Sequence, residues 1–366
     1  MSLLPNSDNS QLLGQLESAI RELPDASVHP RQTEALSNDC GCDAVLTIEV
    51  AGKPTTLFIE AKKSIFPRDV REAIWQIRHY ASTFPQSAGA SQPVPIIVAT
   101  SISDGAKELL RSERIGYFEE GGSLFLPGGD GPYVFLDRPR SKAASRTNRA
   151  LFSGKRSQVV HALLKKPNQW LGVKGLAQEA LVSSATASQV LTELDKFDWL
   201  SSRGSGPHKE RKLVEPRALL DAWAKQQSAS LAKPSIRRFY VSSVKADELL
   251  VRIDEVCSTL NSDYAITGEW AAQLYSPFIS NISQVHCRLP ANQPISEFAT
   301  QMNAREVREG SNLGIIEAKS QGDFLFRERE RNVWLASPIL AYLDLLQSDG
   351  RAKEMAEHLR LERITF

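Results

Sequence analysis

The fold is decided by the stretch Ser183-Ser-Ala-Thr-Ala-Ser-Gln-Val-Leu-Thr-Glu-Leu-Asp-Lys-Phe197 and the polar run Arg203-Gly-Ser-Gly-Pro-His-Lys-Glu-Arg-Lys212 that follows it. In the first run, Ala187, Val190, Leu191 and Leu194 recur at helical spacing, and the leading serines are suited to cap a helix. The glycines of the second run favour a tight turn between two short strands. We therefore predict a helix followed directly by a hairpin.

Two further helices are predicted before this one, at residues 155–166 and at about 173–181. Together with the hairpin they resemble the winged helix-turn-helix of bacterial regulators, over residues 155–233. The resemblance implies that the third helix enters the major groove of DNA and that the hairpin meets phosphates. The implied DNA-binding residues are Thr186, Ser188 and Gln189 on the helix, and Arg203, His208, Lys209, Arg211 and Lys212 on the hairpin.

The charge distribution supports a nucleic-acid partner for this part of the chain. The net charge of +1 divides into −7 for residues 1–137, +11 for 138–233 and −3 for 234–366. Residues 138–154 are a basic linker, and we add Arg146, Arg149, Lys155 and Arg156 to the predicted DNA contacts. Such concentrated positive charge is typical of a nucleic-acid site. The alternative is a patch that docks onto the chain's own acidic flanks.

The N-terminal domain, residues 8–137, is predicted to contain one mixed sheet. A helix at residues 11–23 precedes two β-branched runs, 43–50 and 55–62, which a Gly/Pro turn joins into an antiparallel hairpin. A helix at 68–84, a buried strand at 94–99, a helix at 104–112 and a strand at 115–118 follow.

Three polar residues of this domain stand out. Asp43 begins one strand, and Glu60 and Lys62 share one face of the next because strand side chains alternate. The pattern resembles the Asp…(Asp/Glu)-x-Lys signature of the restriction-endonuclease-like fold. That resemblance implies Mg²⁺ held by Asp43 and Glu60, and an attacking water activated by Lys62, with Glu17 and Gln76 in support. The alternatives are a solvated strand face, or an inactive fold retained as a scaffold.

The C-terminal domain, residues 234–366, contains the stretch Tyr264-Ala-Ile-Thr-Gly-Glu-Trp-Ala-Ala-Gln-Leu-Tyr275. A strand that ends in Thr-Gly and opens a helix resembles the nucleotidyltransferase-like α+β fold. Active members carry a carboxylate pair on the following strand, but Gln284-Val-His-Cys-Arg-Leu289 has no carboxylate. We therefore expect a degenerate domain without transfer activity.

Two more segments extend the resemblance: Leu335-Ala-Ser-Pro-Ile-Leu-Ala-Tyr-Leu-Asp-Leu-Leu346 and Gly350-Arg-Ala-Lys-Glu-Met-Ala-Glu-His-Leu359. With the preceding winged helix, they are similar to the AbiEi antitoxins of type IV toxin–antitoxin systems. The resemblance implies repression of the protein's own operon and a cognate toxin as partner. It covers about half of the chain, and the nuclease-like domain is additional to it.

Composition sets the broad class. A chain of 366 residues with 42% hydrophobic and 24% charged residues is a globular protein of several domains. With no long apolar run and only four cysteines, we expect a protein of the cytoplasm, without membrane contact or disulfides. The resemblance to bacterial regulators and AbiEi antitoxins implies a bacterial protein.

The predicted architecture is α/β and α+β multidomain. The leading hypothesis for function is a DNA-binding transcriptional regulator that needs no cofactor for duplex binding, with a homodimer as the hypothesis for its assembly. The second is a Mg²⁺-dependent nuclease, and the third is an interaction protein whose basic centre binds its own acidic domains.

Overall fold

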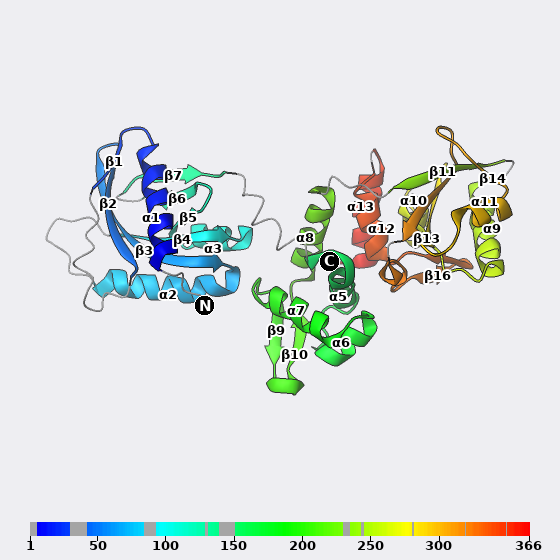
Figure 1. Cartoon of the computed structure of the whole chain (residues 1–366), viewed down its shortest axis with the longest axis horizontal. Helices are drawn as coiled ribbons and strands as arrows, with labels where there is room; N and C mark the ends of the chain where they lie inside the picture. Colours follow the sequence, from blue (N-terminus) through cyan, green and yellow to red (C-terminus); the bar gives the residue numbers. More distant parts are fainter. Residues whose placement is uncertain are drawn as a thin grey trace. The chain divides into compact units, whose positions relative to one another are not determined.

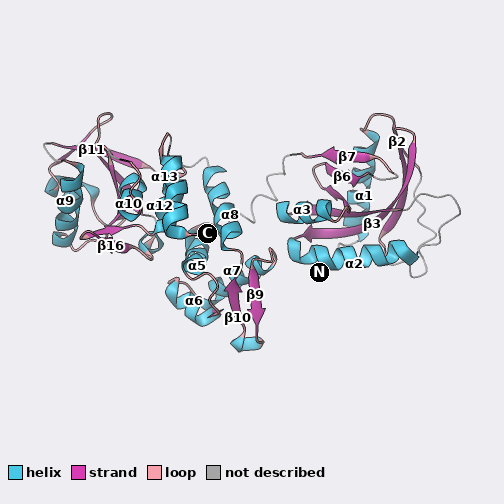
Figure 2. Ribbon diagram, turned by 180° about the vertical axis from the view of Figure 1, so that it is seen from behind, coloured by secondary structure: helices cyan, strands magenta, loops and turns pink. Residues whose placement is uncertain are grey.

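The computed structural model describes residues 6–29, 42–83, 93–128, 131–138, 151–229, 235–242, 245–279, 282–318, 320–348 and 350–366. The chain divides into two compact units. The first contains Met1–Asn148 and Thr192–Asp198, and the second contains Arg149–Leu191 and Trp199–Phe366. Both units combine helices with mixed sheets, which confirms the predicted α/β multidomain class (Figures 1 and 2).

The first unit is built on a seven-stranded sheet whose strands lie in sequence order. β3, β4 and β5 are parallel, and the other neighbours are antiparallel. The elements are α1 (Asn6–Arg21), β1 (Ala26–Val28), β2 (Ala44–Val50), β3 (Lys53–Ile65), α2 (Pro67–Thr83), β4 (Val94–Ile102), α3 (Asp104–Ser112), β5 (Gly116–Glu119), β6 (Ser123–Pro127) and β7 (Tyr133–Leu136). The predicted helix–hairpin–helix–strand order is confirmed, while β1 is an addition that the sequence reasoning missed.

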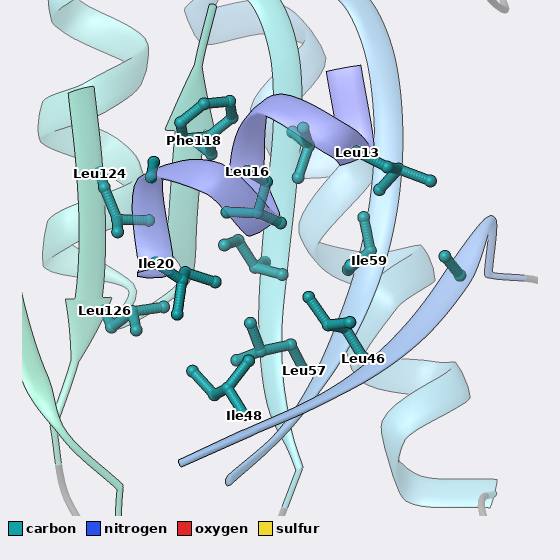
Figure 3. Packing of buried hydrophobic residues seen from close by; sticks show 14 of the residues in the cluster. Leu13, Leu16, Ile20, Leu46, Ile48, Leu57, Ile59, Phe118, Leu124 and Leu126 are labelled. Atoms are coloured by element: carbon teal, nitrogen blue, oxygen red, sulfur yellow. The ribbon is translucent and has the colours of Figure 1, made fainter. Parts of the chain in front are cut away.

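Helices cover both faces of this sheet. Leu16 and Ile20 of α1 pack on Leu46 and Leu57 of the hairpin in one core, which Figure 3 shows from close by. A second core, on the opposite face, joins Val70 and Ile77 of α2 to Leu110 of α3 and to Phe58 and Ile97 of the sheet. The helical spacing of the apolar residues in α2 places them in this core, because side chains three and four residues apart share a helix face.

The central segment, residues 151–229, has the predicted order of three helices and a hairpin. Its elements are α5 (Gly154–Lys165), β8 (Leu171–Gly172), α6 (Val173–Glu179), α7 (Ser184–Asp195), β9 (Leu200–Arg203), η2 (Gly206–His208), β10 (Glu210–Leu213) and α8 (Pro216–Ala229). The three strands form an antiparallel sheet in the order β8-β10-β9. The helix α8 was not predicted.

The C-terminal segment, residues 235–366, contains a second seven-stranded mixed sheet, in the order β14-β11-β15-β13-β12-β17-β16. Its elements are β11 (Ile236–Val241), α9 (Ala246–Thr259), β12 (Ala265–Thr267), α10 (Gly268–Tyr275), β13 (Val285–Pro290), α11 (Ile295–Gln301), β14 (Ala304–Glu306), β15 (Leu313–Ala318), η3 (Gln321–Phe324), β16 (Glu328–Glu330), β17 (Val333–Leu335), α12 (Pro338–Leu345), α13 (Ala352–Leu359) and η4 (Arg360–Ile364). As predicted, β12 runs directly into α10.

Candidate nucleic-acid interface and carboxylate site

The helix α7 presents one polar face to the outside. Its predicted apolar stripe is fully buried. At its start, the Ser183 hydroxyl accepts a hydrogen bond from the Thr186 amide at 3.1 Å and lies 2.9 Å from the Thr186 hydroxyl. Thr186 is therefore engaged in capping. Gln189 is exposed and Ser188 is half-buried, so Gln189 is the predicted base-reading residue with the freest approach.

The hairpin that follows α7 turns through residues of left-handed backbone. Gly204 has φ +72°, and a Cβ at this position would lie 2.8 Å from the carbonyl oxygen of His208. Only glycine fits such a position without a shift of the backbone. His208 is exposed at the tip, and Lys209 is half-buried. The sequence Gly-Ser-Gly thus shapes the turn that the motif predicted.

The cations of the hairpin are held by an aromatic residue that the sequence reasoning missed. The guanidinium of Arg203 lies 4.5 Å from the centre of the Trp170 ring, and the Lys212 ammonium lies 5.2 Å from it. Arg203 also donates to Glu210 through Nε at 2.7 Å. Trp170 precedes β8, and the order β8-β10-β9 brings it to the hairpin. The sequence pattern did not predict the pairing of β8 with β10, which brings Trp170 to the hairpin.

Arg211 requires a correction. Its side chain is only 7% exposed, so we remove it from the set of surface cations. In β10, Arg211 and the buried Leu213 point to the same side because side chains alternate along a strand. The neighbours Lys209 and Lys212 keep part of their surface in solvent.

The structure describes only some of the predicted contacts in and after the basic linker. Arg146 and Arg149 lie outside the described residues. Lys155 is exposed in the first turn of α5, with its Nζ 3.5 Å from the carbonyl oxygen of Leu181. The Nε of Arg156 is buried and has no hydrogen-bond partner within the described ranges. Of the predicted contacts Arg146, Arg149, Lys155 and Arg156, Lys155 is the one that is exposed among the described residues.

The central segment is joined to the C-terminal segment through a buried histidine. His161 of α5 lies 2.8 Å from the Ser337 hydroxyl through Nε2, and its ring packs edge-on against Phe326 at 4.9 Å. Burial lowers the pKa of His161 to about 3, and the nearby Lys165 acts in the same direction. The imidazole is therefore neutral at physiological pH.

Ion pairs surround this junction. Lys165 and Arg363 both contact Glu328, at 2.5 and 2.6 Å. Arg360 contacts Asp221 of α8 at 2.6 Å. The central and C-terminal segments are therefore connected by the Lys165–Glu328 and Arg360–Asp221 ion pairs as well as by the buried His161–Ser337 contact.

In the first unit, the structure brings Asp43, Glu60 and Lys62 together. The Asp43 carboxylate accepts a hydrogen bond from the Ala61 amide at 2.6 Å, and Glu60 forms an ion pair with Lys62. Asp43 is exposed, whereas Glu60 and Lys62 are buried. Burial raises the pKa of Glu60 above 4.5, and the neighbouring Lys62 only partly offsets this.

The two supporting residues have different positions. Glu17 belongs to α1, which packs on the face of the sheet opposite to that of Glu60, and its carboxylate lies 3.5 Å from Arg21. Gln76 is half-buried on α2, on the same side as Glu60 and Lys62. Their roles remain predictions.

A divalent cation is compatible with this site. Asp43 and Glu60 supply oxygen ligands of the kind that Mg²⁺ prefers, and Mg²⁺ keeps several waters, so two carboxylates suffice. Within the described ranges no group of three or more His, Cys, Asp or Glu residues is arranged to hold a metal ion.

A second buried carboxylate–lysine pair lies on the same face, and nothing in the sequence pattern indicated it. The register aligns Lys62 with Ala99 and Ala99 with Glu119 across β3, β4 and β5. Glu119 contacts the Lys107 ammonium at 2.7 Å and accepts from the Ile102 amide at 2.8 Å. This pair fixes the start of α3 against the ends of β4 and β5.

In the C-terminal segment, an ion pair occupies the region where the nucleotidyltransferase resemblance implies a carboxylate pair. Arg288 of β13 donates to both oxygens of Asp344, at 2.6 and 2.8 Å. Thr267, which precedes α10, donates its hydroxyl proton to the same carboxylate. The side chains of Arg288 and Asp344 are about nine-tenths buried. Asp344 therefore ties β12 and β13 to α12.

These elements define a protein with a mixed-sheet unit that carries a carboxylate–lysine site, and a second unit that presents a polar helix and a cationic hairpin. Residues 212–365 match the family model described as transcriptional regulator, AbiEi antitoxin, of the type IV toxin–antitoxin system. This match supports the AbiEi resemblance predicted from the sequence. Neither the curated proteins nor the solved structures contain a match to the chain. In the described ranges, no helix is long and apolar enough to cross a membrane.

Proposed function

We propose that this chain is a DNA-binding transcriptional regulator of the antitoxin kind, which contacts duplex DNA through the central segment as a winged helix. The observation that carries the proposal is the exposed polar face of α7 beside the cationic hairpin, in a chain whose C-terminal part matches an antitoxin regulator family. Gln189 suits adenine in the major groove, since its amide both donates and accepts.

The charge of the chain supports this assignment. The central region carries +11 while its flanks carry −7 and −3, so attraction to phosphates is concentrated beside the proposed reading helix. Trp170 orients Arg203 and Lys212 on the hairpin, which reduces the side-chain entropy they would lose on binding.

The test is duplex binding by fluorescence anisotropy, with DNA from the promoter region of the chain's own gene. We expect affinity to fall steeply between about 50 and 200 mM salt, because each phosphate contact releases counterions. Lys209→Glu with Lys212→Glu should weaken binding to all duplexes, and Gln189→Ala should lower the preference for the promoter by about 1–3 kcal/mol.

The control is Lys353→Glu, which reverses an exposed charge on α13. The proposal fails if the hairpin variant binds as well as the wild type, or if Lys353→Glu is equally impaired. Following the family description, we also propose a cognate toxin as partner. Whether the chain acts as a homodimer stays a prediction that sedimentation would test.

A second candidate function is Mg²⁺-dependent cleavage of DNA, favoured by the convergence of Asp43, Glu60 and Lys62. When bound, the metal would polarise the phosphate and lower the pKa of a coordinated water. Asp43 and Glu60 would hold it, and the Lys62 ammonium, which now neutralises Glu60, would orient the attacking water.

Cleavage is tested with plasmid, linear duplex and single-stranded DNA, in Mg²⁺ or Mn²⁺ and with EDTA as blank. Glu60→Gln should abolish metal-dependent cutting, while Glu120→Gln, which changes an exposed carboxylate beyond β5, should leave it intact. Because Glu60 must be ionised to bind the cation, and its pKa is raised, cutting should decline as the pH is lowered toward that pKa. No cutting of any substrate would leave this unit as a scaffold.

A further inference from the structure

The helix α2 carries an exposed tryptophan that the core does not use. Val70, Ala73, Ile74 and Ile77 of α2 are buried against the sheet, whereas Trp75 is 68% exposed. The ring stacks on that of His79 one turn later, with centroids 5.6 Å apart and an interplanar angle of 2°. With Trp75 68% exposed beside His79, much of the indole remains accessible. Trp75 is therefore an exposed aromatic side chain that is available to a ligand.

Arginines flank this surface. Arg71, Trp75 and His79 follow one another at four-residue steps, which places them in a row about 6 Å apart along the helix. Arg78 lies beside the row, and with Ile74 these residues line an open hollow. The spacing is comparable to that of successive nucleotides in an extended strand.

Both arginines can exchange their present partners. The guanidinium of Arg71 lies 3.5 Å from Asp198, and its side chain is 81% exposed. Arg78 contacts Glu113 at 3.0 Å, with both side chains about half exposed. Arg78 also donates to the Glu113 carbonyl oxygen at 2.8 Å. Ion pairs made by exposed arginines contribute little to stability, so a phosphate can replace the carboxylate at small cost. The row therefore combines one exposed aromatic ring with two arginines whose carboxylate partners a phosphate can replace.

We propose that this face of α2 binds single-stranded nucleic acid, with an unpaired base stacked on Trp75 and phosphates held by Arg71 and Arg78. A protein interface is disfavoured because its centre normally contains several apolar side chains, whereas Trp75 is the single large exposed one among the described residues of α2. A duplex is disfavoured because its bases are already stacked on one another. Stacking on aromatics beside a cationic groove is the usual way to hold a single strand.

The site lies on α2, apart from the polar residues of α7 and from the hairpin, although Arg71 contacts Asp198 of the central segment. It does not depend on metal chemistry. It belongs to the unit that carries Asp43, Glu60 and Lys62, and α2 covers the same face of the sheet as Glu60. If that unit cleaves nucleic acid, Arg71, Trp75 and Arg78 would help to hold the substrate strand. If it does not, the row remains a binding site.

The experiment measures labelled oligo(dT) binding to the full chain by anisotropy, with EDTA present and at about 50 mM salt. Trp75→Ala should weaken binding roughly tenfold or more, and Trp75→Phe should keep most of the affinity because the ring remains. Arg71→Glu should also weaken binding, and Arg71→Gln should lower the salt slope by about 0.7 for the lost phosphate contact.

The matched control is Tyr133→Ala, which removes a 70% exposed aromatic from β7 of the same unit. Duplex binding, measured on the same variants, should not change, which separates this site from the proposed winged helix. Three results would each overturn the proposal: no oligo(dT) binding by the wild type, unchanged affinity in Trp75→Ala, or an equal loss in Tyr133→Ala. A self-association that disappears in Trp75→Ala, with oligo(dT) affinity unchanged, would instead make the row a contact between copies.

Discussion

His161 connects the central segment to the C-terminal segment, and its burial has a consequence for stability. The unfolded chain binds a proton at His161 near pH 6.5, while the folded chain does so only near pH 3. Stability that is fully present above pH 6.5 is therefore lost as the pH falls from 6.5 toward 3, by up to about 1.4 kcal/mol per pH unit. Urea unfolding at pH 7.5 and pH 5 measures this loss.

In His161→Gln, the loss of stability between those two pH values should be smaller by about 2 kcal/mol. The exposed His208→Gln serves as control and should behave as the wild type. An unchanged pH dependence in His161→Gln would mean that His161 is not held neutral in the folded protein.

The Arg288–Asp344 pair makes a second prediction at the scale of single residues. Asp344→Ala should destabilise the second unit by about 3–5 kcal/mol, because it leaves a buried guanidinium without its carboxylate. Asp263→Ala removes the partner of Arg327 in a more exposed pair and should cost much less. Chemical denaturation of the three proteins compares these costs, and equal costs would contradict the structural role given to Asp344.

Single residues also show what sequence patterns can predict. Alternation along β3 correctly placed Glu60 and Lys62 on one face, because that pattern depends only on strand geometry. The same alternation, counted from Leu213, could have shown that Arg211 points inward. The Lys107–Glu119 pair was beyond such reasoning, because Lys107 lies on α3 and Glu119 on β5, and they meet only through the packing of that helix on the sheet.

At the scale of elements, the hairpin β9–β10 depends on a particular backbone conformation at its turn. Gly204→Ala should lower duplex affinity, because a Cβ there collides with the His208 carbonyl and the φ of +72° disfavours alanine. Gly175→Ala in α6, where a Cβ meets no neighbour, should be neutral or slightly stabilising. Anisotropy and thermal unfolding of both variants make the comparison. Equal duplex affinity for both would show that the hairpin does not contribute to binding.

The positions of most helices and strands were predictable because they follow local periodicity. α3 begins and ends where the spacing predicted, and α7 lies within a residue or two of its expected bounds. The strand β1 and the helix α8 were not predicted. β1 has only three residues, and it is defined by pairing with β2 rather than by its own pattern. α8 begins at Pro216 and buries Leu219, Leu220 and Trp223 at helical spacing, a signal that the sequence reasoning did not use.

At the scale of the whole molecule, the charge asymmetry leads to a further prediction. A fragment of residues 138–366 should bind duplex DNA more tightly than the full chain at low salt, because the −7 region that repels phosphates is removed. The difference should shrink at high salt, where such repulsion is screened. Titrations at several salt concentrations test this, and weaker binding by the fragment would mean that residues 1–137 contribute contacts to duplex DNA.

The sequence by itself determined the order of elements, the concentration of positive charge in residues 138–233 and the shared face of Glu60 and Lys62. These properties follow from composition and from the periods of helix and strand, which are set by local backbone geometry. The tertiary structure decided which side chains meet: Trp170 with Arg203, His161 with Ser337, Arg288 with Asp344. Such partners lie up to 176 positions apart, and their contact depends on how whole layers pack and on which strands pair. No local pattern encodes that information.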